Sequence, residues 1–176
     1  MRIDTLISYL RLHYLLWKKR VPEQYLGKRL SIKPGLRLYV GKKCRAFVIH
    51  DDVKINRNVD MEVGQALSIG AGSVIGVGCF LQADGEIRIG TGVLLAPQVK
   101  IFSTSHTYGR EGEIHNPLIK GSVIIEDNVW VGAGTVIALN VRIGRNAVIG
   151  ANSFVNRDIP ENVVAVGTPA RVIRAF

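Results

Sequence analysis

The sequence predicts an all-β protein, a parallel β-helix preceded by one amphipathic α-helix. Three observations predict the β-helix: an aliphatic residue returns at every sixth position, a small or β-branched residue follows four places later, and glycine often comes directly after the aliphatic residue. An α-helix would space apolar residues by three and four, and a lone strand would alternate with a period of two. A six-residue unit instead supplies one short strand and one corner, and three such units complete one coil of a β-helix.

The repeat is clearest between Ile125 and Phe154. Its aliphatic positions are Ile125, Val131, Ile137, Ile143, Ile149 and Val155, and its small positions are Val129, Thr135, Val141, Ala147 and Ser153. We expect both sets to point into the rod. Glycine follows at Gly132, Gly144 and Gly150, where it would permit the backbone conformation that a corner requires.

The first twenty residues predict one amphipathic helix. Apolar residues recur at helical spacing at Ile3, Leu6, Ile7, Leu10, Tyr14 and Trp17, and Leu12, Leu15 and Leu16 widen the stripe. Lys18, Lys19 and Arg20 complement the helix dipole at its end, and Pro22 discourages continuation.

Two interpretations of this helix stay open. It could cap the open end of the β-helix, which would otherwise expose core and strand edges. It could also lie in a membrane interface, with its apolar side chains among the headgroups and its basic cluster near anionic lipid. Asp4 and Arg11 interrupt the apolar run, so we do not expect it to span a bilayer.

The charge is concentrated in the N-terminal quarter. Residues 1 to 45 hold twelve Lys or Arg and two acidic residues, a balance of +10, whereas the whole chain of 176 residues carries +9. The repeats are therefore nearly neutral, which argues against a nucleic-acid partner, because a phosphate-binding surface would repeat Lys and Arg along one face.

The two cysteines have neither disulfide-framework nor metal-site spacing. Together with the lack of a cleavable signal, this predicts a cytoplasmic protein. Cys79 comes four places after Ile75, at the small inward position, so we expect it to pack in the core.

The chain divides into two predicted parts. Residues 1–40 would hold the basic helix and an irregular lead-in, and residues 41–176 the β-helix. The period of six disappears between Phe102 and Ser122, which predicts an extruded loop near residues 103–122. Long loops on rigid scaffolds are frequently functional.

The loop opens with His106, whose unperturbed pKa would let it accept a proton near neutral pH. It is a candidate general base, although a lone loop histidine is more often a solvated surface residue. Trp130 directly precedes the inward Val131, so we expect its ring outside the core, covering the loop, a neighbouring subunit or a pocket. Asp84 lies in a turn sequence, Ala83-Asp84-Gly85.

Several motifs taken together carry a family resemblance. They are Ile89-Gly90, Leu95-Ala96-Pro97, Ser105-His106, Asn128-Val129-Trp130-Val131-Gly132, Asp158-Ile159-Pro160, and the run from Val166-Gly167-Thr168-Pro169 to Arg174. From about Val63 to the C-terminus the chain resembles the hexapeptide-repeat acetyltransferases with a left-handed β-helix. It is most similar to the sugar O-acetyltransferases, which include the galactoside and maltose acetyltransferases and polysaccharide-modifying relatives.

The resemblance implies acetyl transfer from acetyl-CoA, as cosubstrate, to a hydroxyl of a sugar, glycan or polysaccharide precursor. His106 would be the general base of a direct transfer without a covalent acetyl-enzyme, and Asp84 and Trp130 would contact the acceptor. The residues implied to contact CoA are Ala133, Ala151, Asn156, Arg171 and Arg174. Gly76 stands where the galactoside enzymes carry a sugar-binding Asn, so the acceptor need not be the same.

The resemblance also implies a homotrimer with active sites between subunits, His106 from one and part of the CoA groove from the next. Within the acyltransferases, an antibiotic (streptogramin-like) acetyltransferase is an alternative. A metal-dependent hydratase would need three histidines around zinc, for which His13 and His50 are badly placed, and an inert scaffold would not bind CoA. We therefore expect no metal and no nucleic acid, and a cytoplasmic enzyme. If its helix lies in the membrane interface and does not merely cap the rod, the enzyme would be peripheral at the inner membrane face.

Overall fold

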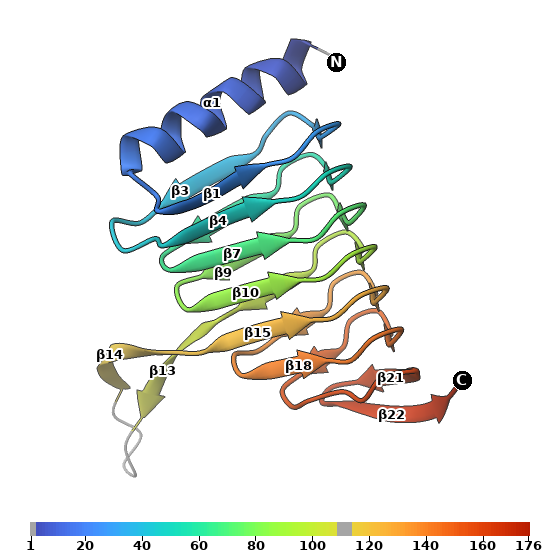
Figure 1. The fold of residues 1–176 in the computed structure, drawn as a ribbon. Coiled ribbons are helices and arrows are strands. Elements are labelled where there is room, and N and C mark those ends of the chain that lie inside the picture. Colours follow the sequence, from blue (N-terminus) through green and yellow to red (C-terminus); the bar gives the residue numbers. More distant parts are fainter. Residues whose placement is uncertain (1–2, 109–113) are drawn as a thin grey trace.

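Three parallel sheets coil into a left-handed β-helix, shaped as a triangular rod, with a helix across its N-terminal end (Figure 1). This computed structural model describes residues 3–108 and 114–176. Each coil passes through the sheets in the same order, which we name A, B and C. We name the corners between successive sheets the A/B, B/C and C/A edges.

The strands of each sheet stack in parallel, except that the last strand of sheet B folds back antiparallel onto its neighbour. Sheet A contains β1 (Glu23–Leu26), β4 (Ala46–Ile49), β7 (Ala66–Ile69), β10 (Glu86–Ile89), β15 (Ser122–Ile125) and β18 (Val141–Ile143). Sheet B contains β2 (Ser31–Ile32), β5 (Lys54–Ile55), β8 (Val74–Ile75), β11 (Leu94–Leu95), β16 (Trp130–Val131), β19 (Val148–Ile149), β21 (Val163–Gly167) and β22 (Ala170–Ala175). Sheet C contains β3 (Arg37–Val40), β6 (Asp60–Val63), β9 (Phe80–Ala83), β12 (Lys100–Phe102), β17 (Val136–Ile137) and β20 (Phe154–Val155).

The predicted repeat is confirmed. All of its aliphatic and small positions from Ile125 to Val155 are buried, and equivalent residues stack coil upon coil, as Ile89 does on Ile125 and Ile125 on Ile143. The stacked strands of the three sheets therefore contribute to one continuous hydrophobic core.

The role expected for the corner glycines is wrong. In these repeats the backbone φ angle is positive not at Gly132, Gly144 or Gly150 but at Gly134 and at corner asparagines such as Asn128 (57°) and Asn146 (59°). A Cβ on Gly132 would lie 2.5 Å from the backbone nitrogen of Ala151 in the next coil. These glycines are needed because consecutive corners approach each other closely.

The coils start earlier than the sequence pattern could be followed. Strands β1, β2 and β3, inside the expected lead-in, pair in parallel with β4, β5 and β6 and complete a first coil. Lys33-Pro34-Gly35 forms its B/C corner, with a φ of 88° at Gly35. The division of the chain at residue 40 stays a prediction, but the β-helix itself begins at Glu23.

Helix α1 (Ile3–Lys19) covers the first coil, but not with the face that the spacing indicated. Leu12 and Leu16 are 3% and 0% exposed and belong to the core. The predicted stripe points away from the rod, since Leu6, Ile7, Leu10, Tyr14 and Trp17 are all exposed; the side chain of Ile3 lies outside the described residues. The helix has two apolar faces, and the first coil covers only one.

The predicted loop contains a hairpin that leaves the rod between β12 and β15. Its strands, β13 (Thr104–Tyr108) and β14 (Ile114–Lys120), pair antiparallel with each other and belong to none of the three sheets. The Thr104 hydroxyl donates to the Ile119 carbonyl over 2.9 Å and holds the base of the hairpin closed.

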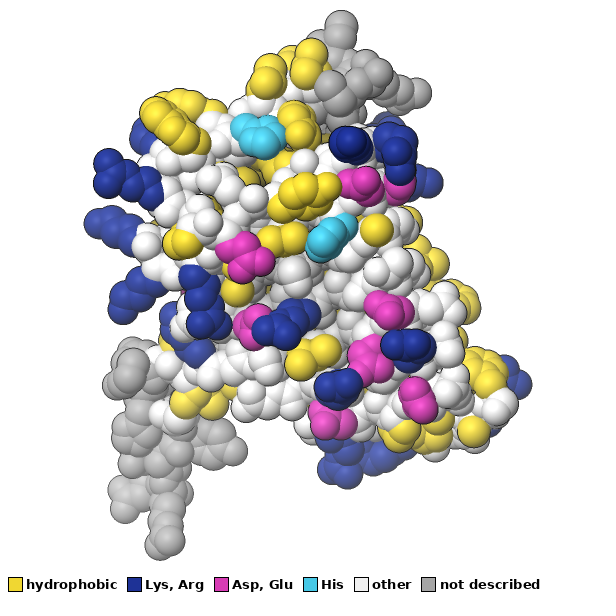
Figure 2. Space-filling view, in the orientation of Figure 1, with side chains coloured by type: hydrophobic (Ala, Val, Ile, Leu, Met, Phe, Trp, Pro, Cys, Tyr) yellow, Lys and Arg dark blue, Asp and Glu magenta, His cyan; other side chains and the backbone are white. Residues whose placement is uncertain are grey.

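The outer surface of sheet A carries ion pairs over its C-terminal half. Basic and acidic side chains alternate over its lower half (Figure 2). Arg88 pairs with Glu86 over 2.7 Å on the outer face, and Arg142 pairs with Glu126. This face is suited to water.

Candidate functional site

The C/A edge carries the candidate catalytic residues. Asp84 lies in the turn between β9 and β10, and His106 lies on β13, shortly after β12 in the next coil. His106 is exposed and Asp84 is half-buried, so both can meet a ligand outside the core. The structure thus places two residues that are 22 positions apart in the sequence on the same edge, in consecutive coils.

Hydrogen bonds fix the hairpin to the Asp84 turn. The buried Ser103 hydroxyl donates to the Gln82 carbonyl over 2.9 Å and accepts from the Gly85 N–H over 2.9 Å. In the coil before, a Cβ on Gly64 would lie 2.5 Å from Asp84 Oδ1 and 2.9 Å from its Cα. Ser103 therefore positions the turn, and Gly64 leaves room for the carboxylate.

Sequence reasoning missed both Ser103 and Gly64. The available signal was weak: Gly64 stood only at a two-residue slip of the repeat, and Ser103 opened a stretch without a period. A buried hydroxyl bonded on both sides can be recognised only once the coils are stacked.

The outer face of sheet B carries most of the other candidates. Trp130 is 51% exposed there and belongs to an apolar column of registered side chains: Val74, Leu94, Trp130, Val148 and Val164. Arg174 pairs with Val164 and Arg171 with Val166, so both arginines continue this face at the C-terminal end of the rod.

The two arginines are available for an anion. Both are exposed; Arg171 donates to the Ala170 carbonyl over 2.7 Å, and the Arg174 guanidinium lies 5.4 Å from the Phe176 ring centroid. Neither takes part in an ion pair within residues 3–108 and 114–176. Guanidinium groups in this state can form forked hydrogen bonds to phosphate.

The remaining cofactor candidates divide between two edges. Ala133 and Ala151 are exposed in consecutive coils of the B/C edge, where their small side chains leave the backbone accessible. Asn156 is exposed on the C/A edge in the last coil, apart from them.

One chain does not place all candidates in one pocket. In a triangular rod the C/A edge lies opposite sheet B, so His106 and Asp84 are on the other side of the core from Trp130 and the two arginines. A cleft that holds all of them would need the C/A edge of one copy to face sheet B of another.

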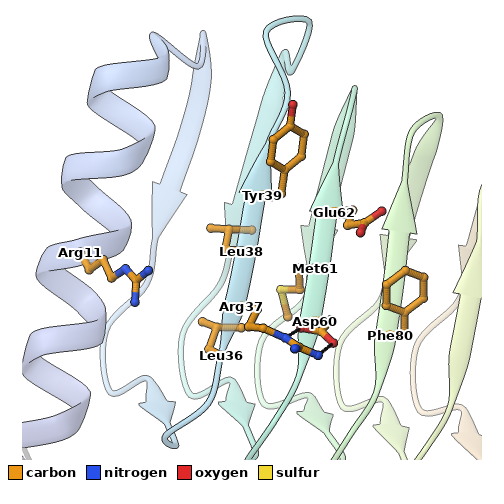
Figure 3. Close-up of a pocket in the computed structure, with 9 residues that line it drawn as sticks. All are labelled: Arg11, Leu36, Arg37, Leu38, Tyr39, Asp60, Met61, Glu62 and Phe80. Atoms are coloured by element: carbon orange, nitrogen blue, oxygen red, sulfur yellow. Dashed lines mark hydrogen bonds and ion pairs between the residues drawn. The ribbon is translucent and has the colours of Figure 1, made fainter.

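A groove of about 540 Å³ lies beside α1 on the outer face of sheet C and crosses strands β3, β6 and β9 (Figure 3). It is lined by Arg11, Leu36, Arg37, Leu38, Tyr39, Asp60, Met61, Glu62 and Phe80. An ion pair joins Arg37 to Asp60, and the Phe80 ring centroid lies 5.7 Å from that of Phe102, the residue before Ser103. The sequence did not predict this groove, because its residues come from three separate coils.

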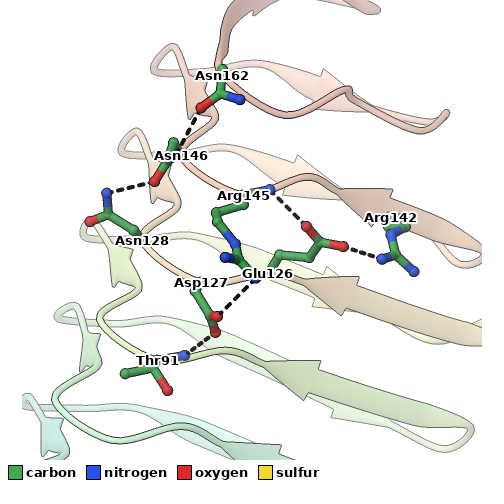
Figure 4. Close-up of polar contacts among 8 residues, drawn as sticks. All are labelled: Thr91, Glu126, Asp127, Asn128, Arg142, Arg145, Asn146 and Asn162. Carbon is green, nitrogen blue, oxygen red and sulfur yellow. Dashed lines mark hydrogen bonds and ion pairs between the residues drawn. The ribbon is translucent and has the colours of Figure 1, made fainter.

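On the A/B edge, by contrast, polar side chains form hydrogen bonds and ion pairs with one another (Figure 4). Asparagines 128, 146 and 162 form a ladder, in which Asn128 donates to Asn146 over 2.9 Å and Asn146 to Asn162 over 2.8 Å. Asp127 accepts from the Thr91 N–H over 2.9 Å. These groups satisfy one another, so this edge offers little to a ligand.

The other cysteine and histidine candidates do not form a site in the described part of the chain. Cys79 is 1% exposed, its thiol donates to the Ala96 carbonyl over 3.3 Å, and burial raises its pKa to about 11, which confirms the prediction of a core residue. The His50 ring lies 5.6 Å from that of Tyr25, and the side chain of His115 lies outside the described residues. The described part of the chain contains no group of three or more His, Cys, Asp or Glu that could hold a metal ion.

Comparison with known proteins agrees with this architecture. The family model described as "Bacterial transferase hexapeptide (six repeats)" matches residues 122–157. The galactoside O-acetyltransferase of Lactococcus lactis is 40% identical over 111 residues, which are 63% of this chain and 54% of that enzyme. The chain thus spans about half the length of the curated relatives it matches.

Two solved structures share the fold. A maltose O-acetyltransferase from Clostridium difficile 630 superposes with a TM-score of 0.58 at 29% identity, over 90% of this chain and 72% of that one. An N-acyltransferase from Bacillus cereus, in complex with dTDP and 3-hydroxybutyryl-CoA, superposes with a TM-score of 0.75 at 20% identity, over 90% and 86%. Residues 122–157 carry the repeats of the bacterial hexapeptide transferases, and the chain as a whole resembles the hexapeptide-repeat sugar acetyltransferases that share its left-handed β-helix.

Proposed function

We propose that this chain is an acetyl-CoA-dependent O-acetyltransferase that acts on a hydroxyl of a sugar, glycan or polysaccharide precursor. The observation that carries the proposal is that Asp84 and the exposed His106 share one edge, in consecutive coils of a β-helix that is 40% identical to a galactoside O-acetyltransferase over 111 residues. An acceptor can reach the imidazole there without entering the core.

In this mechanism His106 accepts the proton of the acceptor hydroxyl while the oxygen attacks the acetyl carbonyl of the thioester. A backbone N–H stabilises the oxyanion of the tetrahedral intermediate. The C–S bond then breaks, and the proton passes from the imidazole to the CoA thiolate. Asp84 accepts a hydrogen bond from the acceptor and orients it, and no acetyl-enzyme forms.

The residues proposed to bind CoA lie on sheet B, on the B/C edge and on the C/A edge. Arg171 and Arg174 bind phosphates of CoA through charge-assisted hydrogen bonds, and Ala133 and Ala151 let the pantetheine arm pass close to the backbone. Trp130 forms a wall of the acyl and acceptor pocket. Asn156 contacts the cofactor from the C/A edge.

The two groups of residues meet in a homotrimer, in which the C/A edge of one subunit faces sheet B of the next. Such a head-to-tail contact closes into a ring at a fixed rotation. Its support in this chain is the apolar column on sheet B, which a neighbour would cover. Each active site then lies between two subunits.

The proposed enzyme requires no metal and works in the cytoplasm, in peripheral contact with the inner face of the membrane through α1. Its partners are other copies of itself and a small-molecule or glycan acceptor, not nucleic acid.

Replacement of His106 tests the proposal. Release of CoA thiol from acetyl-CoA should be measured across free sugars, nucleotide sugars, lipid-linked glycans and antibiotics. General-base catalysis is worth about a hundredfold to ten-thousandfold, so His106→Ala should lose at least about a hundredfold in kcat. His50→Ala is the matched control, because that exposed histidine lies on the A/B edge. A His106→Ala variant that keeps its turnover would contradict the assignment.

A further inference from the structure

The side of α1 that faces away from the rod is apolar and uncovered. Its five large side chains are 42% (Leu6), 58% (Ile7), 59% (Leu10), 59% (Tyr14) and 71% (Trp17) exposed. Their spacing places them on one side of a helix, opposite to Leu12 and Leu16. A soluble helix at the end of a rod needs only the buried side, so the second apolar side requires another explanation.

Basic side chains surround one end of this face. Lys18, Lys19 and Arg20 close the helix, and the Lys19 ammonium lies 5.7 Å from the centroid of the Tyr39 ring at the end of β3. The corner that follows β3 adds three more exposed cations, Lys42, Lys43 and Arg45. We call these six residues the basic cluster.

Within the described residues, no acidic side chain forms an ion pair with the basic cluster. By contrast, Arg29 and Arg37 of the same coil pair with Asp52 and Asp60. Its charge is therefore free to act on something outside the chain.

The combination favours a lipid surface over a second protein. Tyr and Trp rings beside Lys and Arg are typical of helices that lie among lipid headgroups, where the long cationic side chains reach phosphates and the apolar side chains enter the acyl boundary. Cores of protein interfaces are depleted of Lys. Sheet B already offers a separate apolar surface to another copy.

We propose that the outer face of α1, together with the basic cluster, docks the protein onto an anionic membrane surface. The helix lies in the plane of the bilayer; no helix within residues 3–108 and 114–176 has the length and apolar content to cross it. The rod then projects from the membrane with its C/A edge running outward.

The number of coils between the basic cluster and His106 sets the distance of the candidate site from the membrane. From the corner of Lys42 it passes Gly64 and Asp84 to the coil of His106, which is three strand spacings, or about 14 Å. At this height His106 could reach glycans that are carried by the membrane. That functional benefit rests on the proposed function. The docking itself does not rest on it.

Co-sedimentation of the full chain with lipid vesicles tests the docking. We expect binding to vesicles of phosphatidylcholine with added phosphatidylglycerol, little binding to phosphatidylcholine alone, and release as salt shortens the Debye length below its value of about 8 Å at physiological ionic strength. Ile7→Ser combined with Leu10→Ser should weaken binding at least tenfold. Lys42→Glu combined with Lys43→Glu should do the same.

Each double variant has a matched control at the other end of the rod or further along it. Val172→Ser with Ile173→Ser removes two comparably exposed apolar side chains, and Lys100→Glu with Arg157→Glu makes the same change in charge; both should bind as the unchanged chain does. Circular dichroism checks that each variant is folded.

Three results would overturn the docking: no binding to either vesicle, equal binding by the Ile7→Ser/Leu10→Ser variant, or a loss of oligomers by that variant without any vesicle, which would make the face a contact between copies. Acetyl transfer to a soluble acceptor is measured in parallel. Transfer without vesicle binding would reject only the docking, and vesicle binding without transfer would reject only the enzyme.

Discussion

Sheets A and B have the same inner surface and opposite outer surfaces. Inside, both present stacked aliphatic residues, such as Ile89 and Ile125 in sheet A and Leu95 and Val131 in sheet B. Outside, sheet A carries the pairs Glu86–Arg88 and Glu126–Arg142 at or beside it, whereas sheet B carries the apolar column from Val74 to Val164. The repeat specifies the rod, and the outward positions specify which face is charged and which is apolar.

The largest effect should come from a charge placed on the apolar column. Leu94→Asp would bury a carboxylate where, in the proposed trimer, a neighbouring copy packs. This costs several kcal/mol, so we expect monomers in sedimentation velocity and loss of acetyl transfer. Ile124→Asp is the matched variant on the outer face of sheet A and should keep the oligomer. The same oligomeric state and the same activity in both variants would contradict a difference in role between the outer faces of sheets A and B.

Loss of the two C-terminal arginines should affect the cofactor. Charge-assisted hydrogen bonds contribute about 1.5–3 kcal/mol each, so Arg171→Ala or Arg174→Ala should raise the KM for acetyl-CoA by roughly tenfold or more, with a smaller change in kcat. Arg88→Ala on sheet A removes an arginine of similar exposure and serves as control. An unchanged KM in both arginine variants would remove the phosphate contacts from the proposal.

A smaller effect is expected at the anchor of the Asp84 turn. Ser103→Ala leaves the buried Gly85 N–H without its acceptor, which should lower the free energy of unfolding by about 1–3 kcal/mol. If the turn positions Asp84, the KM for the acceptor should also rise while that for acetyl-CoA stays the same. Ser68→Ala, at an outward position of sheet A, is the control for stability. A loss of stability without any change in KM would make Ser103 structural only.

The smallest effect concerns the interior that both faces share. Burial raises the pKa of the Cys79 thiol to about 11, so only about one thiol in a thousand is ionised at pH 8. Native protein should therefore react slowly with iodoacetamide, faster as the pH approaches 11, and rapidly once denaturant exposes the thiol. Fast reaction of Cys79 in the folded state at pH 8 would show that the core opens.

Much of the fold could be predicted because the inward positions obey a local rule. A period of six identifies the coils from Val63 onward, and the burial of Cys79 follows from its place in that period. The first coil was not predicted, because its strands adopt the β-helix geometry without a clear six-residue repeat. The buried face of α1 escaped because the helix is apolar on two sides, and only the shape of the first coil selects Leu12 and Leu16.

The candidate site was predictable only as a set of residues. Motifs named His106, Asp84, Trp130 and the C-terminal arginines, but a linear sequence does not say that the first two share an edge while the others lie on the opposite face. That separation depends on which corner each residue occupies. The groove along sheet C and the hydrogen bonds of Ser103 likewise arise only when coils stack.

The most direct test of the account is to mix two defective chains. At an acetyl-CoA concentration well below the KM of the arginine variant, His106→Ala and the double variant Arg171→Ala/Arg174→Ala should each be weakly active alone. The mixed, reassembled oligomers should recover acetyl transfer, because some interfaces would pair an intact C/A edge with an intact sheet B. Activity of the mixture well above the average of its two components is the predicted result. Activity equal to that average would mean that each chain carries its own complete site, and would contradict a site built between the C/A edge of one copy and sheet B of the next.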